Sequence, residues 1–455
     1  MKELQRTTFK TSRLLEYFSE KELTMQIGHT RLMWPIALLK ELIDNALDAC
    51  EGAGVQPVIE VTIEDDSVLV RDNGPGIPRA TIEKSLDYIY RVSDKTNYVS
   101  PSRGQLGNAL KCVWAAPYVV NGEYGRVDVE VGGEIHRIKV ILDRVAQEPR
   151  IDHHVETGNV KKGTLVRIHW DGIASYLNAD ESVDFYNDED SEDDDPFDSP
   201  DVSDLISTHE LISRYAAFNP HATFILNSET ISEPMKGTWR KWRSNECTSA
   251  QWYDAERLRN LIAAYVTEER DGGSAKTVRE FVSEFRGFTS TVKQKCVTEA
   301  SGLSGLYLHD LVNGDGVDIH RVETLLDVMK QNSKPVNPRL LGIIGQEWIT
   351  DWMASKSYVD SQSVRYKKIL ATNENGLPFV LEIGLGIYCS KHEGRGRTLA
   401  VGLNWTPVLA DIPCREISEA LQAARVDKHD PVCVAIHIAC PRLEFTGHGK
   451  GQIRL

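Results

Sequence analysis

A helix with one polar face is the feature that most constrains this chain. The segment WPIALLKELIDNALDAC, residues 34–50, repeats its apolar residues at helical spacing. At about 100° per residue, Glu41, Asn45 and Asp48 lie within about 60° of one another on one face. The residues on the opposite side are apolar: Leu39, Leu42, Ala46 and Ala49. The pattern predicts a helix that packs on a sheet with its apolar side.

The polar face of this helix has the side chains that phosphate hydrolysis needs. Asn45 offers a neutral oxygen to Mg²⁺, which prefers oxygen ligands and keeps most of its waters. Glu41, one turn away, can orient and deprotonate an attacking water molecule. A plain amphipathic surface helix would show the same face, so the helix alone leaves both interpretations open.

A glycine-rich loop follows the helix. The segment VIEVTIEDDSVLVRDNGPGIP, residues 58–78, is typical of two strands that run into a turn. Gly74 and Gly76 allow positive φ and a close approach of the main chain. Asp72, at the end of the second strand, can accept a hydrogen bond from an exocyclic amine such as that of adenine. A plain turn between a strand and a helix is the alternative.

Two further segments carry glycines next to regular structure. In SRGQLGNALK, residues 102–111, two glycines precede a helix, so free main-chain N–H groups can point at phosphate oxygens. Such a loop is weak evidence when it stands alone. The segment KKGTLVRIHW places Gly163 and Thr164 at the start of a later strand.

In this order and spacing, the four segments resemble the GHKL superfamily of ATPases, which includes gyrase B, MutL, the heat-shock chaperone and sensor histidine kinases. The resemblance covers about the first 230 residues and implies a Bergerat-type α/β sandwich that binds ATP and Mg²⁺. It implies that Glu41 is catalytic and that Asn45 binds the metal. It also implies that Asp72 binds adenine and that Thr164 supports the adenine site.

The resemblance further implies that residues 102–111 form a lid over the phosphates. Ala109 stands where the family pattern G-x-x-G-x-G has its third glycine, so we expect lid closure or nucleotide affinity to differ. The remaining residues expected to bind the nucleotide are Asp48, Gly74, Gly76, Ser102, Arg103, Gly104, Gln105, Leu106, Gly107, Asn108, Ala109 and Lys111.

Length and charge restrict the organisation of the chain. A chain of 455 residues is too long for one core and should form about two to four domains. Its net charge of −15 means that any contact with nucleic acid has to come from a local basic patch. Residues 180–204 are dense in Asp and Glu and predict a solvated, disordered insertion; an acidic docking peptide is the alternative. No apolar run reaches about 18 residues, so we expect no membrane span and a cytoplasmic protein.

Other segments resemble the B subunit of topoisomerase VI, a type IIB DNA topoisomerase. They are LLEYFSEKELTMQIGHTRL near the N-terminus, ISRYAAFNPHATF, TVREFVSEFRGFTSTVKQKCV, NPRLLGIIGQEW and GLNWTPVL. The resemblance implies an α+β chain in three parts: a GHKL ATPase domain (1–234), a helical domain of the helix–two-turns–helix kind (235–332) and an α+β transducer-like domain (333–455).

The tail PRLEFTGHGKGQIRL, residues 441–455, carries the pattern P-x-x-x-F-T-x-x-G-K of the same family. The resemblance implies that Lys450 contacts the γ-phosphate and assists catalysis, because a compact ammonium between glycines can approach a phosphate. Contact with the triphosphate alone would make this lysine a switch, in a homodimer that forms when ATP binds. A frayed end with a stray charge is the alternative.

Two basic stretches interrupt the acidic chain, KGTWRKWR (236–243) and FRGFTSTVKQK (285–295). Solvated loops with a partly buried tryptophan are one interpretation, and phosphate contacts with DNA are the other. The candidate cations are Lys236, Arg240, Lys241, Arg243, Arg286, Lys293 and Lys295.

The function implied by the resemblance is ATP-gated. The chain would couple ATP binding and hydrolysis to DNA capture or cleavage by a separate A-like subunit, because no DNA-cleaving machinery is evident in this sequence. It would be nucleoid-associated when bound to DNA. The alternative is a stand-alone ATP-switched clamp or regulatory module in genome maintenance or anti-phage defence, without topoisomerase activity.

Overall fold

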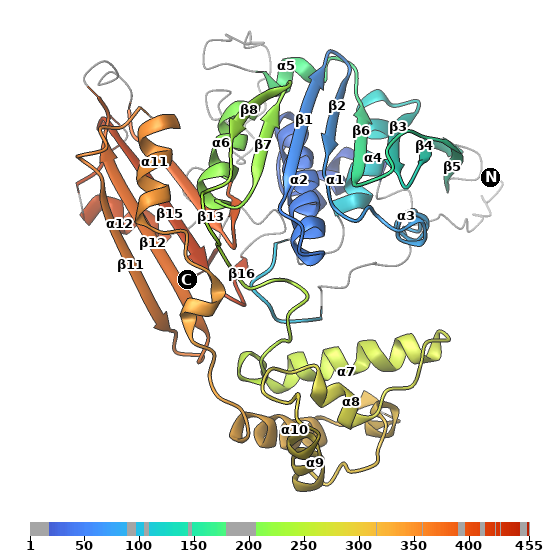
Figure 1. Cartoon of the computed structure of the whole chain (residues 1–455). Helices are drawn as coiled ribbons and strands as arrows, with labels where there is room; N and C mark the ends of the chain where they lie inside the picture. The colour runs from blue at the N-terminus through green and yellow to red at the C-terminus, as the bar shows by residue number, and fades with distance from the viewer. Residues whose placement is uncertain are drawn as a thin grey trace, which may run out of the picture.

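The computed structural model shows three parts of the chain (Figure 1): a large sheet with helices behind it, a second sheet that carries helices, and a group of helices below both. The residues that the structure describes are 18–88, 97–103, 109–143, 148–178, 206–314, 316–356, 358–389, 396–409, 415–423, 425–427, 429–445 and 453–454. The acidic stretch 180–204 and Lys450 lie outside them, so the predictions made for both stay untested.

The first part is built on an eight-stranded sheet in the order β5-β4-β3-β6-β2-β1-β7-β8. Its strands are β1 (Val58–Glu64), β2 (Ser67–Arg71), β3 (Gly125–Val131), β4 (Glu134–Asp143), β5 (Glu148–Thr157), β6 (Thr164–His169), β7 (Thr223–Leu226) and β8 (Glu229–Ser232). Neighbours run antiparallel, except that β1 and β7 run parallel. The predicted α+β class is confirmed.

Helices cover one face of this sheet (Figure 1). They are α1 (Glu20–Ile27), η2 (Arg31–Met33), α2 (Trp34–Gly52), α3 (Arg79–Ser85), α4 (Ala109–Asn121), α5 (Ile173–Leu177) and α6 (Thr208–Phe218). The longest, α2, has Pro35 in its first turn, where a missing N–H costs nothing. Leu39, Ile43 and Leu47 are fully buried, which fixes the apolar side of α2 against the sheet.

The helical part lies between the two sheets in the sequence. It contains η4 (Ala250–Trp252), α7 (Ala255–Arg270), α8 (Val278–Ser283), α9 (Thr291–Ala300), η5 (Leu308–Leu311), the short pair β9 (Val312–Asn313) and β10 (Gly316–Val317), and α10 (Ile319–Gln331). Side chains fix where these helices begin: Asp254 caps α7, and Thr277 and Glu280 form a capping box on α8. Its core continues into the C-terminal part through Trp405 and Ala439.

The C-terminal part is a five-stranded sheet in the order β11-β12-β15-β13-β14. Its elements are η6 (Pro338–Leu341), α11 (Gln346–Lys356), β11 (Arg365–Thr372), β12 (Pro378–Ile387), β13 (Thr398–Leu403), β14 (Thr406–Pro407), α12 (Arg415–Ala423), β15 (Val432–Ala439), β16 (Glu444–Phe445) and β17 (Ile453–Arg454). β11 is an edge strand with two exposed lysines, which weakens the usual alternation. Within the described ranges, no helix is both long and apolar enough to cross a membrane.

Candidate nucleotide site

Asp72 directly follows β2 and is buried. Its Oδ1 accepts a hydrogen bond from the N–H of Gly74 at 2.7 Å, and its own N–H donates to the carbonyl oxygen of Thr164 at 2.9 Å. Burial raises the pKa of Asp72, and the hydrogen bonds from Gly74 and Thr164 offset this only in part. The carboxylate is therefore a fixed acceptor at the end of β2.

Glycines make the close packing around Asp72 possible. Gly163 has a φ of +79°, and a Cβ atom there would lie 1.9 Å from the carbonyl oxygen of Asp72. Gly76 has the positive φ expected from the sequence, but Gly74 does not, which corrects that prediction. A glycine is needed at position 74 for another reason, which is the close approach of the loop to α2. A Cβ added there would lie 2.9 Å from the Asp72 carboxylate and 3.3 Å from the main-chain nitrogen of Cys50.

The loop after β2 is fastened to both neighbouring elements. The hydroxyl of Thr164 accepts a hydrogen bond from the N–H of Ile77 at 3.2 Å, which ties the loop to β6. The amide oxygen of Asn73 accepts from the N–H of Val58 at 2.9 Å and from the thiol of Cys50 at 3.3 Å. Asp72 therefore lies beside the C-terminal half of α2.

The polar face of α2 is partly open. Glu41, Asn45 and Asp48 are half-buried, and the Glu41 carboxylate lies 3.7 Å from the ammonium of Lys40. The opposite side packs as expected at Leu39, Leu42 and Ala46, which are buried, whereas Ala49 is half-buried. The roles of Glu41 and Asn45 in catalysis and metal binding stay predictions.

The predicted lid is only partly within the described residues. Gly104, Gln105, Leu106, Gly107 and Asn108 lie outside them. Ser102 is buried, and its hydroxyl has no hydrogen-bond partner among the described residues, which fits an oxygen of a bound ligand. Ala109, in place of the third family glycine, is the first residue of α4.

Lys111 does not have the position predicted for a phosphate contact. Its side chain is buried in α4, where the ammonium donates to the main-chain oxygen of Asp87 at 2.6 Å and lies 5.7 Å from the centre of the Tyr88 ring. An amphipathic lysine on a mostly apolar helix packs its stem inward, which the loop pattern alone does not predict.

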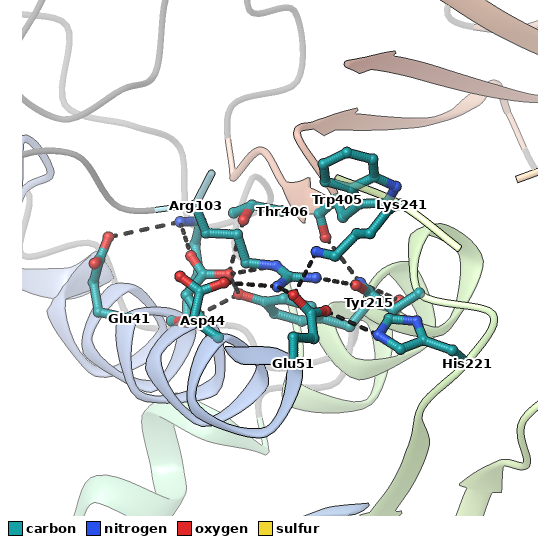
Figure 2. A network of polar contacts seen from close by, with 12 residues as sticks. Glu41, Asp44, Glu51, Arg103, Tyr215, His221, Lys241, Trp405 and Thr406 are labelled. Atoms are coloured by element: carbon teal, nitrogen blue, oxygen red, sulfur yellow. Dashed lines mark hydrogen bonds and ion pairs between the residues drawn. The ribbon is translucent and has the colours of Figure 1, made fainter. Parts of the chain in front are cut away.

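Arg103 also departs from its predicted role over the phosphates. Its guanidinium is fully buried and donates to Asp48 at 2.9 Å, to Glu51 at 2.8 Å and to the side-chain oxygen of Asn219. Burial alone would lower the pKa of Arg103, but the carboxylates of Glu51, Asp48 and Asp44 outweigh it and raise the pKa. The side chain is therefore part of a buried charge cluster on α2, shown in Figure 2.

Glu51 lies at one end of this cluster. The ammonium of Lys241 lies 2.6 Å from the same Glu51 oxygen that Arg103 contacts, and His221 reaches the other oxygen at 2.9 Å. Burial opposes the charged form of Glu51, but Arg103, Lys241 and His221 together hold its pKa well below the usual value. Burial and the nearby Arg103 charge lower the pKa of Lys241 to about 8, although Glu51 opposes this.

Asp44 lies at the other end of the cluster and connects α2 with the C-terminal part. Its Oδ1 accepts from the hydroxyls of Tyr215 and Thr406, both at 2.8 Å, and Lys40 pairs with its Oδ2 at 3.2 Å. Burial would lower the pKa of Lys40, but the charges of Asp44 and Glu41 raise it. Three buried cations (Lys40, Arg103, Lys241) thus face the carboxylates of Asp44, Asp48 and Glu51, and Lys40 also contacts Glu41, so each buried cation has at least one carboxylate partner.

The sequence interpretation missed Asp44, Glu51 and Tyr215. A signal was present, because Asp44, Asp48 and Glu51 recur at i, i+4 and i+7 and so extend the polar face of the helix. What the sequence could not supply is their partners, which come from distant segments.

Three of the predicted DNA-contacting arginines converge. Arg240, Arg243 and Arg286 line one open hollow of about 650 Å³ between the helical part and the end of α2. Arg240 pairs with Glu246 at 3.4 Å, and the guanidinium of Arg286 lies 5.2 Å from the Trp242 ring centre. This arrangement is a concave cationic surface.

The other predicted cations are not in this hollow. Lys236, Lys293 and Lys295 are exposed elsewhere, and Lys295 lies 3.6 Å from Glu299 on its own helix. Lys241 is wrong as a DNA contact, because it is buried and paired with Glu51. Neighbours in a short basic stretch point to different sides of the chain, which composition alone does not reveal.

Comparisons with known proteins find similarity to ATPases and to topoisomerase subunits. Residues 33–171 match the family model of histidine kinase-, DNA gyrase B- and HSP90-like ATPases. Over 98% of its length the chain is 29% identical to the B subunit of type 2 DNA topoisomerase 6 from Pyrococcus abyssi, of which it covers 82%. The corresponding protein of Thermococcus onnurineus is 23% identical, with the same coverage of both chains.

A solved structure with some likeness is the ATPase region of Saccharomyces cerevisiae topoisomerase II. It aligns with 92% of this chain and 76% of its own, at a TM-score of 0.38 and 9% sequence identity. The region matched by the family model contains Glu41, Asn45, Asp72 and Thr164.

Proposed function

We propose, from the premise that this chain is a homologue of the B subunits of type 2 DNA topoisomerase 6 with a GHKL-type ATPase domain, that it is the ATP-hydrolysing subunit of a type IIB DNA topoisomerase. The observation that carries the proposal is the buried Asp72 at the end of β2, which the Cys50–Asn73 contact holds beside the C-terminal end of α2. The relatives do not favour the alternative of a stand-alone clamp.

In the proposed reaction, Glu41 acts as the general base. It lies on a rigid helix, half-buried, so it can orient a water molecule and take its proton on a carboxylate oxygen. Asn45, one turn along α2, would hold Mg²⁺ through its amide oxygen. When bound, Mg²⁺ supplies positive charge that offsets the charge of the phosphates.

Asp72 and the loop after β2 select the base. The carboxylate has one oxygen committed to Gly74, and we propose that it accepts the exocyclic amine of adenine. Ser102, with its buried hydroxyl, is proposed to lie beside the bound nucleotide. Lys450, which lies outside the described residues, is proposed to contact the γ-phosphate when two protomers pair.

Replacing Asp72 with asparagine tests the adenine site. The amide oxygen can still accept from Gly74, but an NH₂ group then faces the adenine amine and cannot accept from it. We expect ATP affinity to fall about 10- to 100-fold, the usual range for a lost hydrogen bond to a charged group. Calorimetric titration with a non-hydrolysable ATP analogue measures this. Asp65→Asn, in the exposed β1–β2 turn, is the control, and equal affinity in both variants would remove Asp72 from the site.

We also propose that this chain acts together with a separate A-like subunit that cleaves DNA. The cationic hollow gives this chain its own place for the DNA backbone, since three guanidiniums face one concave surface. A phosphodiester backbone suits planar guanidiniums, which pair with phosphate oxygens in two-point contacts.

The salt dependence of DNA binding tests the hollow. With Arg240, Arg243 and Arg286 replaced by glutamine, we expect the slope of log K against log salt to decrease by about 2 to 3, since each phosphate contact contributes about 0.9. The control replaces Arg137, Lys139 and Arg150, at the outer edge of the eight-stranded sheet, with the same loss of charge. If both triple variants change the slope equally, net charge rather than the hollow determines binding.

A further inference from the structure

Residues 97–103, which we call the stem, join the helical part to α2. At its first end, Val99 is buried in the core of the helical part. The main-chain oxygen of Val99 accepts from the Thr248 hydroxyl at 2.7 Å, and its N–H donates to the Tyr253 hydroxyl at 2.9 Å. The sequence gives no indication of this docking, because Val99 lies in the sequence between α3 and α4, two helices of the first part.

A tyrosine next to Val99 strengthens the same anchor. The hydroxyl of Tyr98 lies 3.2 Å from the Glu284 carboxylate and also contacts the hydroxyl of Tyr265. Tyr265 itself donates to Glu284 at 2.8 Å, and Lys276 pairs with that carboxylate. Tyr98 therefore completes a polar group whose other members all belong to the helical part.

The second end of the stem is anchored by Arg103. Its guanidinium pairs with Asp48 and Glu51 of α2 and contacts Asn219. The amide of Asn219 in turn donates to the main-chain oxygen of Trp405 at 2.8 Å, in the C-terminal part. The Arg103 side chain thus fixes the stem to α2 and, through Asn219, to the C-terminal part (Figure 2).

The two anchors are close together along the chain. Five residue steps separate Tyr98 from Arg103, and a fully extended chain spans at most about 3.5 Å per step. The stem can therefore span at most about 18 Å. A shift of the helical part relative to α2 must displace the stem or, where it exceeds this reach, break one anchor. Ser102, which the proposed function places beside the nucleotide, lies between the two anchors in the sequence and next to Arg103.

We propose that the stem is a positioning element of the nucleotide site, with Tyr98 and Arg103 as its positioning residues. Neither side chain contacts the nucleotide. Together they determine the position of Ser102, so the affinity for ATP depends on how the helical part and the C-terminal part are placed against α2. This inference rests on the proposed function.

Steady-state ATP hydrolysis by the full chain, with its DNA and partner conditions held constant, tests the stem. For Arg103→Met we expect KM for ATP to rise about tenfold while kcat changes less than about twofold, the pattern of a loss in binding alone. For Tyr98→Phe, which keeps the ring, we expect a rise in KM of about threefold. A purely structural role would reduce the amount of folded protein without changing KM.

Two matched variants control the experiment. Lys241→Met removes a buried cation from the same Glu51 oxygen but outside the stem, and Tyr366→Phe removes a hydroxyl contact to a buried glutamate, Glu382, in the C-terminal part. Both are expected to keep the KM of the unmodified chain.

Each outcome decides the inference. If Lys241→Met raises KM as much as Arg103→Met, or if both stem variants keep the original KM, the stem has no positioning role. If the Arg103→Met variant does not fold, the KM values of Tyr98→Phe and Tyr366→Phe are compared instead. Equal KM values would mean that the stem has no positioning role. Absence of hydrolysis in the unmodified chain would contradict the proposed function itself, and titration of a non-hydrolysable ATP analogue into the same variants, with dissociation constants in place of KM, would then decide the stem separately.

Discussion

Replacing Glu41 with glutamine is expected to reduce ATP hydrolysis by about 10²- to 10⁴-fold, the contribution typical of a general base. The change keeps the shape of the side chain, and Glu41 is half-buried at a helical position, so the fold of α2 should not change. ATP should still bind, because the adenine and phosphate contacts are assigned to other residues. Release of phosphate measures the first effect, and titration of a non-hydrolysable ATP analogue measures the second.

The control for this variant is Glu268→Gln, which neutralises an exposed glutamate on α7. It should hydrolyse ATP at the rate of the unmodified chain. If Glu41→Gln hydrolyses ATP undiminished, the proton is taken by another group and the role assigned to Glu41 is wrong. If ATP binding is lost as well, Glu41 contributes to binding rather than to the chemical step.

A second large effect is expected at Gly163. Alanine at a φ of +79° costs about 1 to 2 kcal/mol, and its Cβ would in addition lie 1.9 Å from the carbonyl oxygen of Asp72. That contact cannot be relieved by rotating a side chain, because the main chain just before β6 fixes the Cβ and the oxygen belongs to the main chain just after β2. We expect Gly163→Ala to lower the thermal midpoint markedly and to weaken ATP binding more than tenfold, by a displacement of Asp72 worth more than about 1.4 kcal/mol.

The variant Gly172→Ala separates the cost of the positive φ from the effect of the contact with Asp72. Gly172 has a φ of +70°, but no atom lies within 4 Å of the Cβ it would gain. It should therefore show the backbone cost alone, with ATP affinity unchanged. Equal effects of the two variants on stability and affinity would mean that the packing between Gly163 and Asp72 has no special importance. Differential scanning fluorimetry and the same ATP titration provide both measurements.

Local patterns predicted most of the elements near the site. The helical period of residues 34–50, the glycines after β2 and the strand that begins at Thr164 are each encoded by neighbours in the sequence. Asp72 lies at the end of its strand as expected, because the buried run of β2 ends before the exposed Arg71. The expected positive φ of Gly74 was wrong, since its need for glycine comes from contacts with Cys50 and Asp72.

What could not be predicted depends on contacts between distant segments. Arg103 and Lys241 were assigned to phosphates of the nucleotide and of DNA, because a cation in a glycine-rich or basic stretch has no visible partner in the sequence. The structure pairs both with Glu51, which lies 52 residues from Arg103 and is buried. Sequence reasoning recognises a charged residue, but whether it faces solvent is decided by tertiary packing.

The charge cluster on α2 also bears on the order in which the protein is made. Thr406 contacts Asp44 across 362 positions of the chain, and Lys241 meets Glu51 only after the helical part has begun. During synthesis from the N-terminus, the carboxylates of α2 emerge long before the last of their partners. The first part of the chain can form its sheet early, but its polar interior is complete only after Thr406 has emerged, so this folding step follows the synthesis of β13 and β14.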